Sequence, residues 1–160
     1  MRRRTLVIAA TAAGVLLAAG AATAVLAADG HRGAEGPAAD AAYDYPELTD
    51  ADRADPTAAI ERLQIPADRL EAMTSEALVR SVLEFPYMGN AFASNELNGE
   101  VAFLAEQCNA LAALLERPDA ADAVAAVRTT FVDGGEVETA EYGAMKLELL
   151  DLIAAAVAPE

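Results

Sequence analysis

ELNGEVAFLAEQCNALAALLER, residues 96–117, contains the clearest hydrophobic periodicity in the chain. Residues with spacings of three and four lie on one face of an α-helix, because the helix has about 3.6 residues per turn. The pattern therefore predicts a core-facing helix from about Glu96 to Arg117, with Cys108 buried on that face. The residues on the predicted face are Val101, Leu104, Cys108, Leu111 and Leu115.

Helix start and stop signals divide the residues before this stretch. Asp55 followed by Pro56 is typical of an N-cap and a first helical residue, and Pro66 interrupts the helix that they begin. A short helix is expected over residues 68–73. Thr74 then caps a further helix, which Pro86 ends. The apolar face expected for this helix consists of Leu78, Val79, Val82 and Leu83.

Two more helices are expected after Pro118. The first ends before the turn signal at residues 133–135, and the second extends from Thr139 to Val157. The second is apolar around so much of its circumference, Met145 included, that we expect it to be central. Because no β-strand alternation persists, the predicted fold is all-α, an irregular bundle of five or six helices. The face expected on the first helix is Ala120, Val124, Val127 and Phe131.

The N-terminus has the layout of an export signal. Arg2, Arg3 and Arg4 precede a stretch of 24 uncharged residues, 5–28. Such a stretch behind positive charge enters the translocon as a secretory signal or as an uncleaved anchor. Residues 22–24, Ala-Thr-Ala, offer a signal-peptidase site, yet the stretch is also long enough to span a bilayer. We therefore predict a signal peptide or signal anchor over residues 1–28, and a product that is secreted or anchored on the outer face of the cytoplasmic membrane.

The part of the chain after residue 28 is strongly acidic. Three of the 11 Lys and Arg precede it, which leaves 8 basic against 26 acidic residues, a net charge of −18. This charge repels phosphate backbones and anionic lipid. Nucleic acid is therefore excluded as a partner, and contact with a membrane is expected only through residues 5–28 if they are not cleaved.

Composition divides this acidic part into a linker and a domain. Residues 29–54 are rich in Gly, Ala and Asp and contain few large apolar side chains, so they bury too little surface to offset the entropy of ordering. We expect a flexible acidic linker over residues 29–54 and a helical domain over residues 55–158. Cys108 is the one cysteine in the chain, so the domain depends on its hydrophobic core rather than on a disulfide.

Residues 65–86, IPADRLEAMTSEALVRSVLEFP, match the signature IPxxxLxxM-[ST]-x-E-x-L-V-x-x-V-L-x-[YF]-P. Through this signature, residues 65–121 resemble a poorly characterised helical domain of secreted and surface proteins of bacteria. Related sequences usually have an aromatic residue where Cys108 stands. The resemblance implies export and a helical fold, and it implies no activity. The excess of Arg over Lys and the abundance of Ala are also typical of a GC-rich bacterial genome.

The residues that usually perform catalysis are scarce. His31 is the one histidine and lies in the predicted linker, so a Ser-His-Asp triad or a zinc site lacks its ligands. We expect no metal and no cofactor. Acidic pairs that could share a helix face, Glu96 with Glu100 and Glu138 with Glu141, support an alternative function. That alternative is a carboxylate-dependent hydrolase acting on the cell wall or a polysaccharide.

The best candidate site is the irregular connection EFPYMGNAFASNELN, residues 84–98. A connection that carries large apolar side chains either plugs the core or presents a binding surface. The expected function is an extracytoplasmic helical interaction or structural domain, whose partner is an unidentified extracytoplasmic protein or cell-envelope component. The binding surface would consist of Phe85, Tyr87, Met88, Asn90, Phe92 and Asn95.

Overall fold

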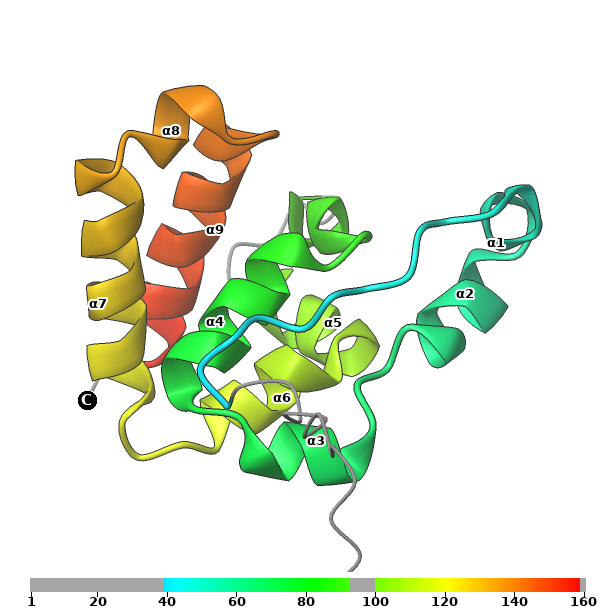
Figure 1. Ribbon diagram of the computed structural model, residues 1–160, viewed down its shortest axis with the longest axis horizontal. Helices are drawn as coiled ribbons and strands as arrows, with labels where there is room; N and C mark the ends of the chain where they lie inside the picture. The colour runs from blue at the N-terminus through cyan, green and yellow to red at the C-terminus, as the bar shows by residue number, and fades with distance from the viewer. Residues whose placement is uncertain (1–38, 93–99, 159–160) are drawn as a thin grey trace, which may run out of the picture. The chain divides into compact units, whose positions relative to one another are not determined.

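The computed structural model describes residues 39–92 and 100–158 of the chain. These described residues are 71% helical and form nine α-helices and no β-strand (Figure 1). The prediction of an all-α fold is therefore confirmed. The expected number of helices is too low, because one predicted helix is divided into two and two further short helices, α1 and α8, are present.

The helices pack around α4. It contacts α6 and α7, and α7 in turn contacts α9 (Figure 1). In chain order the elements are α1 (Asp50–Ala54), α2 (Pro56–Arg62), α3 (Ala67–Ala72), α4 (Ser75–Glu84), the 3₁₀-helix η1 (Met88–Phe92), α5 (Glu100–Gln107), α6 (Asn109–Leu115), α7 (Ala120–Asp133), α8 (Glu136–Thr139) and α9 (Gly143–Ala156).

The start and end of α4 follow the local sequence signals. Thr74 is the N-cap, and its hydroxyl accepts a hydrogen bond from the backbone N–H of Ala77 at 3.3 Å. The helix ends at Glu84, two residues before Pro86. All four residues of its predicted apolar face are buried, which confirms that face.

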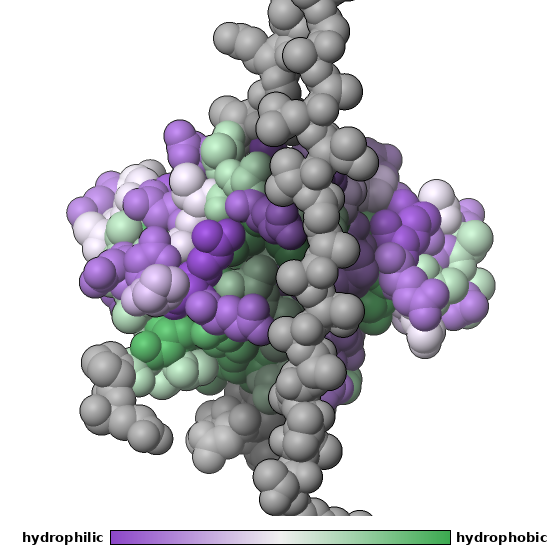
Figure 2. Space-filling model, turned by 90° about the horizontal axis from the view of Figure 1, so that it is seen from below, coloured by the Kyte–Doolittle hydropathy of each residue, from purple (hydrophilic) through white to green (hydrophobic). Residues whose placement is uncertain are grey.

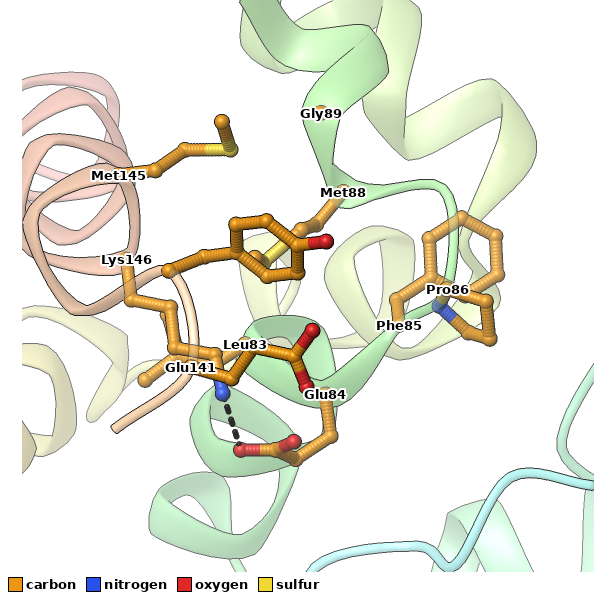
Figure 3. Close-up of a pocket in the computed structure, with 10 residues that line it drawn as sticks. Leu83, Glu84, Phe85, Pro86, Met88, Gly89, Glu141, Met145 and Lys146 are labelled. Carbon is orange, nitrogen blue, oxygen red and sulfur yellow. Dashed lines mark hydrogen bonds and ion pairs between the residues drawn. The ribbon is translucent and has the colours of Figure 1, made fainter. Parts of the chain in front are cut away.

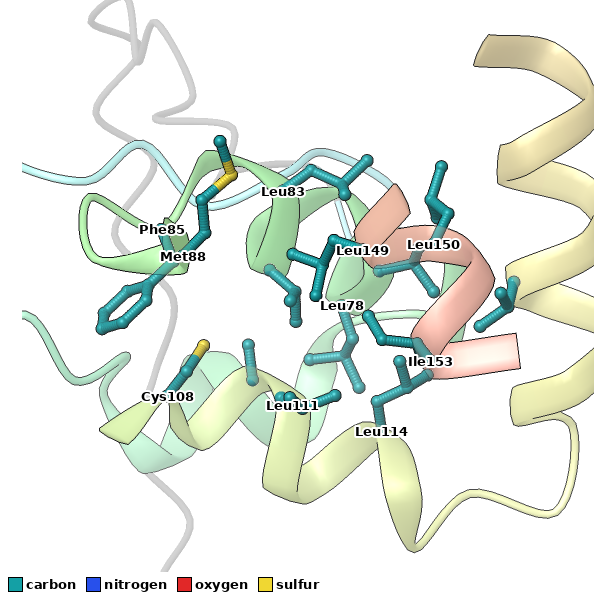
Figure 4. Packing of buried hydrophobic residues seen from close by; sticks show 14 of the residues in the cluster. Leu78, Leu83, Phe85, Met88, Cys108, Leu111, Leu114, Leu149, Leu150 and Ile153 are labelled. Carbon is teal, nitrogen blue, oxygen red and sulfur yellow. The ribbon is translucent and has the colours of Figure 1, made fainter. Parts of the chain in front are cut away.

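The hydrophobic core lies where α4, α6, α7 and α9 meet (Figure 4). The predicted face of α7 is buried as expected. Met145 of α9 is 36% exposed, so this helix is less enclosed than its composition suggests. The completely buried side chains at the centre include Leu78, Leu111, Leu114, Leu149 and Ile153.

The helix expected over residues 96–117 is divided at Cys108. This residue is 1% exposed, as predicted, but its backbone is extended, with φ −125° and ψ 102°. The break changes the helical phase, so that Leu114 is fully buried whereas Leu115 is 37% exposed. The prediction of one continuous helix is therefore wrong for the described residues 100–117.

The side chain of Gln64, in the segment before α3, binds the backbone at this break. The amide of Gln64 donates to the carbonyl of Gln107 at 2.9 Å and accepts from the N–H of Asn109 at 3.1 Å. The amide of Asn109 in turn accepts from the N–H of Ile65 at 3.1 Å and donates to its carbonyl at 2.8 Å. Backbone groups removed from water need such partners. The two bonds from Gln64 therefore satisfy backbone groups at the interruption, and the two from Asn109 satisfy the backbone of Ile65.

Residues 39–49 pack along the helical domain, although the sequence places them in a flexible linker. Tyr43, Tyr45 and Leu48 contact the core. The rings of Tyr45 and Phe85 meet edge to face, with centroids 5.6 Å apart. Even partly buried, two tyrosines and a leucine remove apolar surface from water, and the average composition of the segment does not reveal this contribution.

The linker prediction is therefore wrong for residues 39–54, which include α1. Residues 29–38 and the predicted signal or anchor over residues 1–28 lie outside the described residues. Within residues 39–92 and 100–158, no helix combines the length and the apolar character needed to cross a membrane.

Asp52 connects α1 to α2. Its carboxylate accepts two hydrogen bonds from Arg62, at 3.1 and 2.7 Å, and two from the N–H and hydroxyl of Thr49, both at 2.7 Å. These donors favour the ionised form and lower the pKa of Asp52 from 3.8 to about 2. The unfolded chain therefore binds this proton more readily than the folded chain.

We predict a specific loss of stability in acid. Because the folded-state pKa of Asp52 is lowered, its contribution is present above pH 3.8 and is lost as the pH falls towards about 2. The urea midpoint of the wild type should therefore fall more steeply across this pH window than that of Asp52→Asn. Asp50→Asn, on the exposed side of α1, is the matched control and should retain the wild-type slope. Equal slopes for the wild type and Asp52→Asn would contradict the prediction.

Candidate functional site

The predicted contact residues do not form one exposed surface. Phe85 is 2% exposed and Met88 is 7% exposed, so both belong to the core plug rather than to an exposed anchor. Tyr87 and Phe92 are half-buried and pack against the core. The prediction of an exposed recognition surface is therefore wrong for Phe85 and Met88.

Of the two asparagines predicted to bind a partner, Asn90 lies within the described residues. Asn90 is half-buried, and its amide donates a hydrogen bond to the side chain of Gln107 at 2.6 Å. This bond fixes η1 against α5, which is a structural role. Asn95 lies outside the described residues.

A pocket of about 370 Å³ lies beside the plug, between the end of α4, η1 and the start of α9 (Figure 3). We call it the α4–η1–α9 pocket. Phe85 and Met88 line it from the predicted segment, and Met145 and Lys146 line it from α9. Phe85 and Met88 thus form one wall of a cavity as well as part of the core. The opposite wall comes from α9, which the sequence pattern did not identify as part of a site.

A buried lysine forms part of the pocket wall. Lys146 is the one lysine in the chain and is 6% exposed. Its Nζ donates to Oε1 of Glu84 at 2.7 Å (Figure 3). A buried ammonium group needs such a counter-charge, because its desolvation is otherwise very costly. The Glu84–Lys146 ion pair therefore holds the end of α4 against α9.

Tyr142, which also lines the pocket, has a backbone conformation that is rare for an aromatic residue. Its φ is 57° and its ψ is 29°, in the left-handed region, and no other non-glycine residue of the described part has a positive φ. This conformation costs roughly 1–2 kcal/mol. Its side chain is nevertheless 61% exposed, so burial of the ring does not offset that cost.

The residue that follows Tyr142 is a glycine for a steric reason. A Cβ on Gly143 would lie 2.7 Å from the carbonyl oxygen of Glu136 and 2.8 Å from the carbonyl carbon of Val137. The close approach of α8 to α9 thus requires glycine at 143, directly after the left-handed Tyr142. Strained residues of this kind concentrate at functional sites.

Glu141 adds an uncompensated negative charge to the pocket. Its side chain is exposed, and it has no hydrogen bond or ion pair within the described residues. The carboxylate of Glu84 is already paired with Lys146. The two carboxylates and one ammonium group of the pocket therefore leave a net negative charge at its mouth.

The α9 half of the pocket does have sequence signals. A lysine between Met145 and Leu147 in a mostly apolar helix indicates a buried ion pair, and Tyr142 directly before a glycine at a helix start indicates an unusual turn. Neither signal identifies the opposite wall, because Glu84 is 62 residues away from Lys146.

Tyr45 and Cys108 form a second buried polar contact. The hydroxyl of Tyr45 has no oxygen or nitrogen hydrogen-bond partner, and the polar group that faces it is the thiol of Cys108, a weak partner. Burial raises the pKa of both groups above their ordinary values. Cys108 is therefore a neutral core thiol, which is a poor nucleophile.

The acidic pairs behind the hydrolase alternative are not assembled into a cleft that the structure describes. Glu138 is exposed and does not line the α4–η1–α9 pocket, although Glu141 does. Glu96 and the side chain of Glu100 are outside the described part. Among the described residues, no group of three or more His, Cys, Asp and Glu could hold a metal ion.

A further apolar surface lies away from the pocket. Figure 2 shows hydrophobic residues gathered on one side of the face that it draws, the side where Figure 1 shows α7 and α9. Leu115, Ala156 and Val157 line a shallow depression at the C-terminal end of α9. Arg117 also lines the depression, but its guanidinium donates to the carbonyl of Met73 at 3.3 Å, and none of the described lining residues has a positive φ.

Comparison with protein-family models, with curated proteins and with solved structures gives no match for this chain. The resemblance of residues 65–121 to a bacterial surface domain therefore stays a prediction.

Proposed function

We propose that this protein is an exported helical interaction domain whose contact site is the α4–η1–α9 pocket. The observation that carries the proposal is Tyr142, which is exposed at the pocket and held in a strained backbone conformation. An exposed aromatic residue beside a pocket is a common form of binding hot spot. A contact with a partner would bury the ring that the isolated domain leaves in water.

The neighbouring side chains suit a protein contact. Met145 is 36% exposed, and the buried Phe85 and Met88 add apolar surface to the lining of the same pocket. Aromatic residues and methionine are enriched at protein interfaces, where they fill pockets with little specific geometry required. The proposed partner is an extracytoplasmic protein or a cell-envelope component.

Export is supported by Arg2 to Arg4 and the uncharged residues 5–28 that follow them. The acidic composition agrees with a soluble surface outside the cell. Fractionation of the producing cells should recover the protein outside the cytoplasm or in the cytoplasmic membrane. Recovery of the full chain from the cytosol would contradict this part of the proposal.

Site-specific photo-cross-linking in the producing cells tests the contact site. A benzophenone side chain replaces Met145 in one variant and Val132 in a second. Val132 is the matched control, because it is 41% exposed on α7 and does not line the pocket. We expect a discrete cross-linked product from position 145 and none from position 132. The product should decrease at least about fivefold when Tyr142→Ala is added, as for loss of roughly 1 kcal/mol or more of binding energy.

The effect of Tyr142→Ala on cross-linking needs a stability control. Tyr142→Ala should unfold at nearly the wild-type temperature, because the side chain is mostly exposed. Identical products from positions 145 and 132, or none from position 145, would reject the pocket as the contact site.

A further inference from the structure

We propose that the occupant of the α4–η1–α9 pocket is a protein segment in which an apolar side chain stands next to an arginine or a lysine. This inference rests on the proposed function and specifies the chemistry of the partner. The inference combines two features of the pocket, its apolar lining and the unpaired negative charge of Glu141.

The size and lining of the pocket indicate one large apolar side chain. Its volume of about 370 Å³ is at the lower end for small-ligand pockets, which are roughly 300–1,000 Å³. Met88 and Met145 line it from η1 and α9 (Figure 3), and the thioether side chain adapts to differently shaped groups. The pocket therefore accepts an aromatic or a branched aliphatic side chain.

The charges of the pocket select a cation as the neighbour of that side chain. Lys146 is buried and already bound to Glu84, so an incoming carboxylate would have to displace that partner. Glu141 has no partner within the described residues, and a cation beside it gains an ion pair without breaking one. The ring of Tyr142 offers the same cation an exposed aromatic face.

The net negative charge of the whole chain also favours a basic partner segment. A formal net charge of −15 attracts basic segments and repels acidic ones over the distance of a Debye length, about 8–10 Å at moderate salt. Electrostatic complementarity of this kind contributes mainly to partner choice and to the association rate. An acidic or a phosphorylated segment is therefore the least favourable occupant.

Methyl NMR titration of the full chain with three matched dipeptides tests the inference. The probes are acetyl-phenylalanyl-arginine amide and its analogues with glutamine or glutamate in place of arginine. Two methionines report on the pocket, Met88 and Met145, whereas Met73, 2% exposed in the core, is an internal reference. We expect the arginine probe to shift the resonances of Met88 and Met145 but not that of Met73. Its affinity should exceed that of the glutamine probe by about threefold, and the glutamate probe should bind most weakly.

Charge variants locate the source of this preference. Glu141→Gln should remove most of the difference between the arginine and glutamine probes, and so should a salt concentration of about 1 M, which screens exposed charges. Glu148→Gln is the matched control, because Glu148 is exposed on the same helix but does not line the pocket. It should retain the wild-type preference.

The outcomes separate the two proposals. If all three probes shift Met88 and Met145 with equal affinity, the cationic occupant is rejected, whereas the pocket remains a contact site. If no probe shifts either resonance, or if Met73 shifts with them, the inference is also rejected. In that case the cross-linking at position 145 decides independently whether the pocket is the contact site.

Discussion

Leu111→Ala is expected to lower the free energy of unfolding by about 3–5 kcal/mol. Leu111 lies on α6 and is completely buried in the core between α4 and α9 (Figure 4). The substitution removes the transfer energy of the deleted atoms and leaves a cavity that surrounding helices fill only in part. Urea unfolding followed by circular dichroism measures the change.

Leu115→Ala is the matched control, since Leu115 is on the same helix but is 37% exposed. Its expected cost is below about 1 kcal/mol. The periodicity of residues 96–117 predicts equal effects at both positions, whereas the break at Cys108 predicts a large difference. Comparable losses for Leu111→Ala and Leu115→Ala would therefore support a continuous helix and contradict the break.

Gly143→Ala is expected to cost about 3 kcal/mol, at the upper end for an added methyl group. The new Cβ would lie 2.7 Å from the carbonyl oxygen of Glu136 and would also meet the carbonyl group of Val137. These are backbone atoms, so the clash is relieved only if α8 moves away from α9. Thermal unfolding should show a clear decrease in Tm.

Two substitutions show whether this effect is specific to the close approach. A Cβ on Gly89 would meet only the sulfur of Met145, at 4.0 Å, so Gly89→Ala should be neutral or stabilising by up to about 1 kcal/mol. Tyr142→Asn should retain or increase stability, because asparagine tolerates a positive φ better than tyrosine does. Wild-type stability of Gly143→Ala would contradict the steric requirement for glycine where α8 approaches α9.

The sequence by itself determined the elements that depend on nearby residues. Asp55 with Pro56, Thr74, and Pro86 mark helix ends in the structure as they do in the sequence. The apolar faces of α4 and α7 also follow from spacing alone. A cap needs only groups within about one turn, and a face needs only the helical repeat, so both can be predicted without knowledge of the packing.

The break at Cys108 was decided by tertiary contacts. The hydrogen bonds that satisfy its backbone come from the side chain of Gln64, which precedes Gln107 by 43 and Asn109 by 45 positions. Periodicity reports only which residues would share a face if the helix continued. It contains no information about side chains from another segment that can satisfy the backbone at an interruption.

The candidate pocket was likewise decided by tertiary structure. The sequence singled out residues 84–98 because apolar groups gather there, yet burial divides this segment between plug and pocket wall. The other wall, with Tyr142 and Lys146, follows from the packing of α9 beside the end of α4. A pocket is formed by surfaces that distant segments leave uncovered, so it depends on the whole packing arrangement rather than on any local pattern.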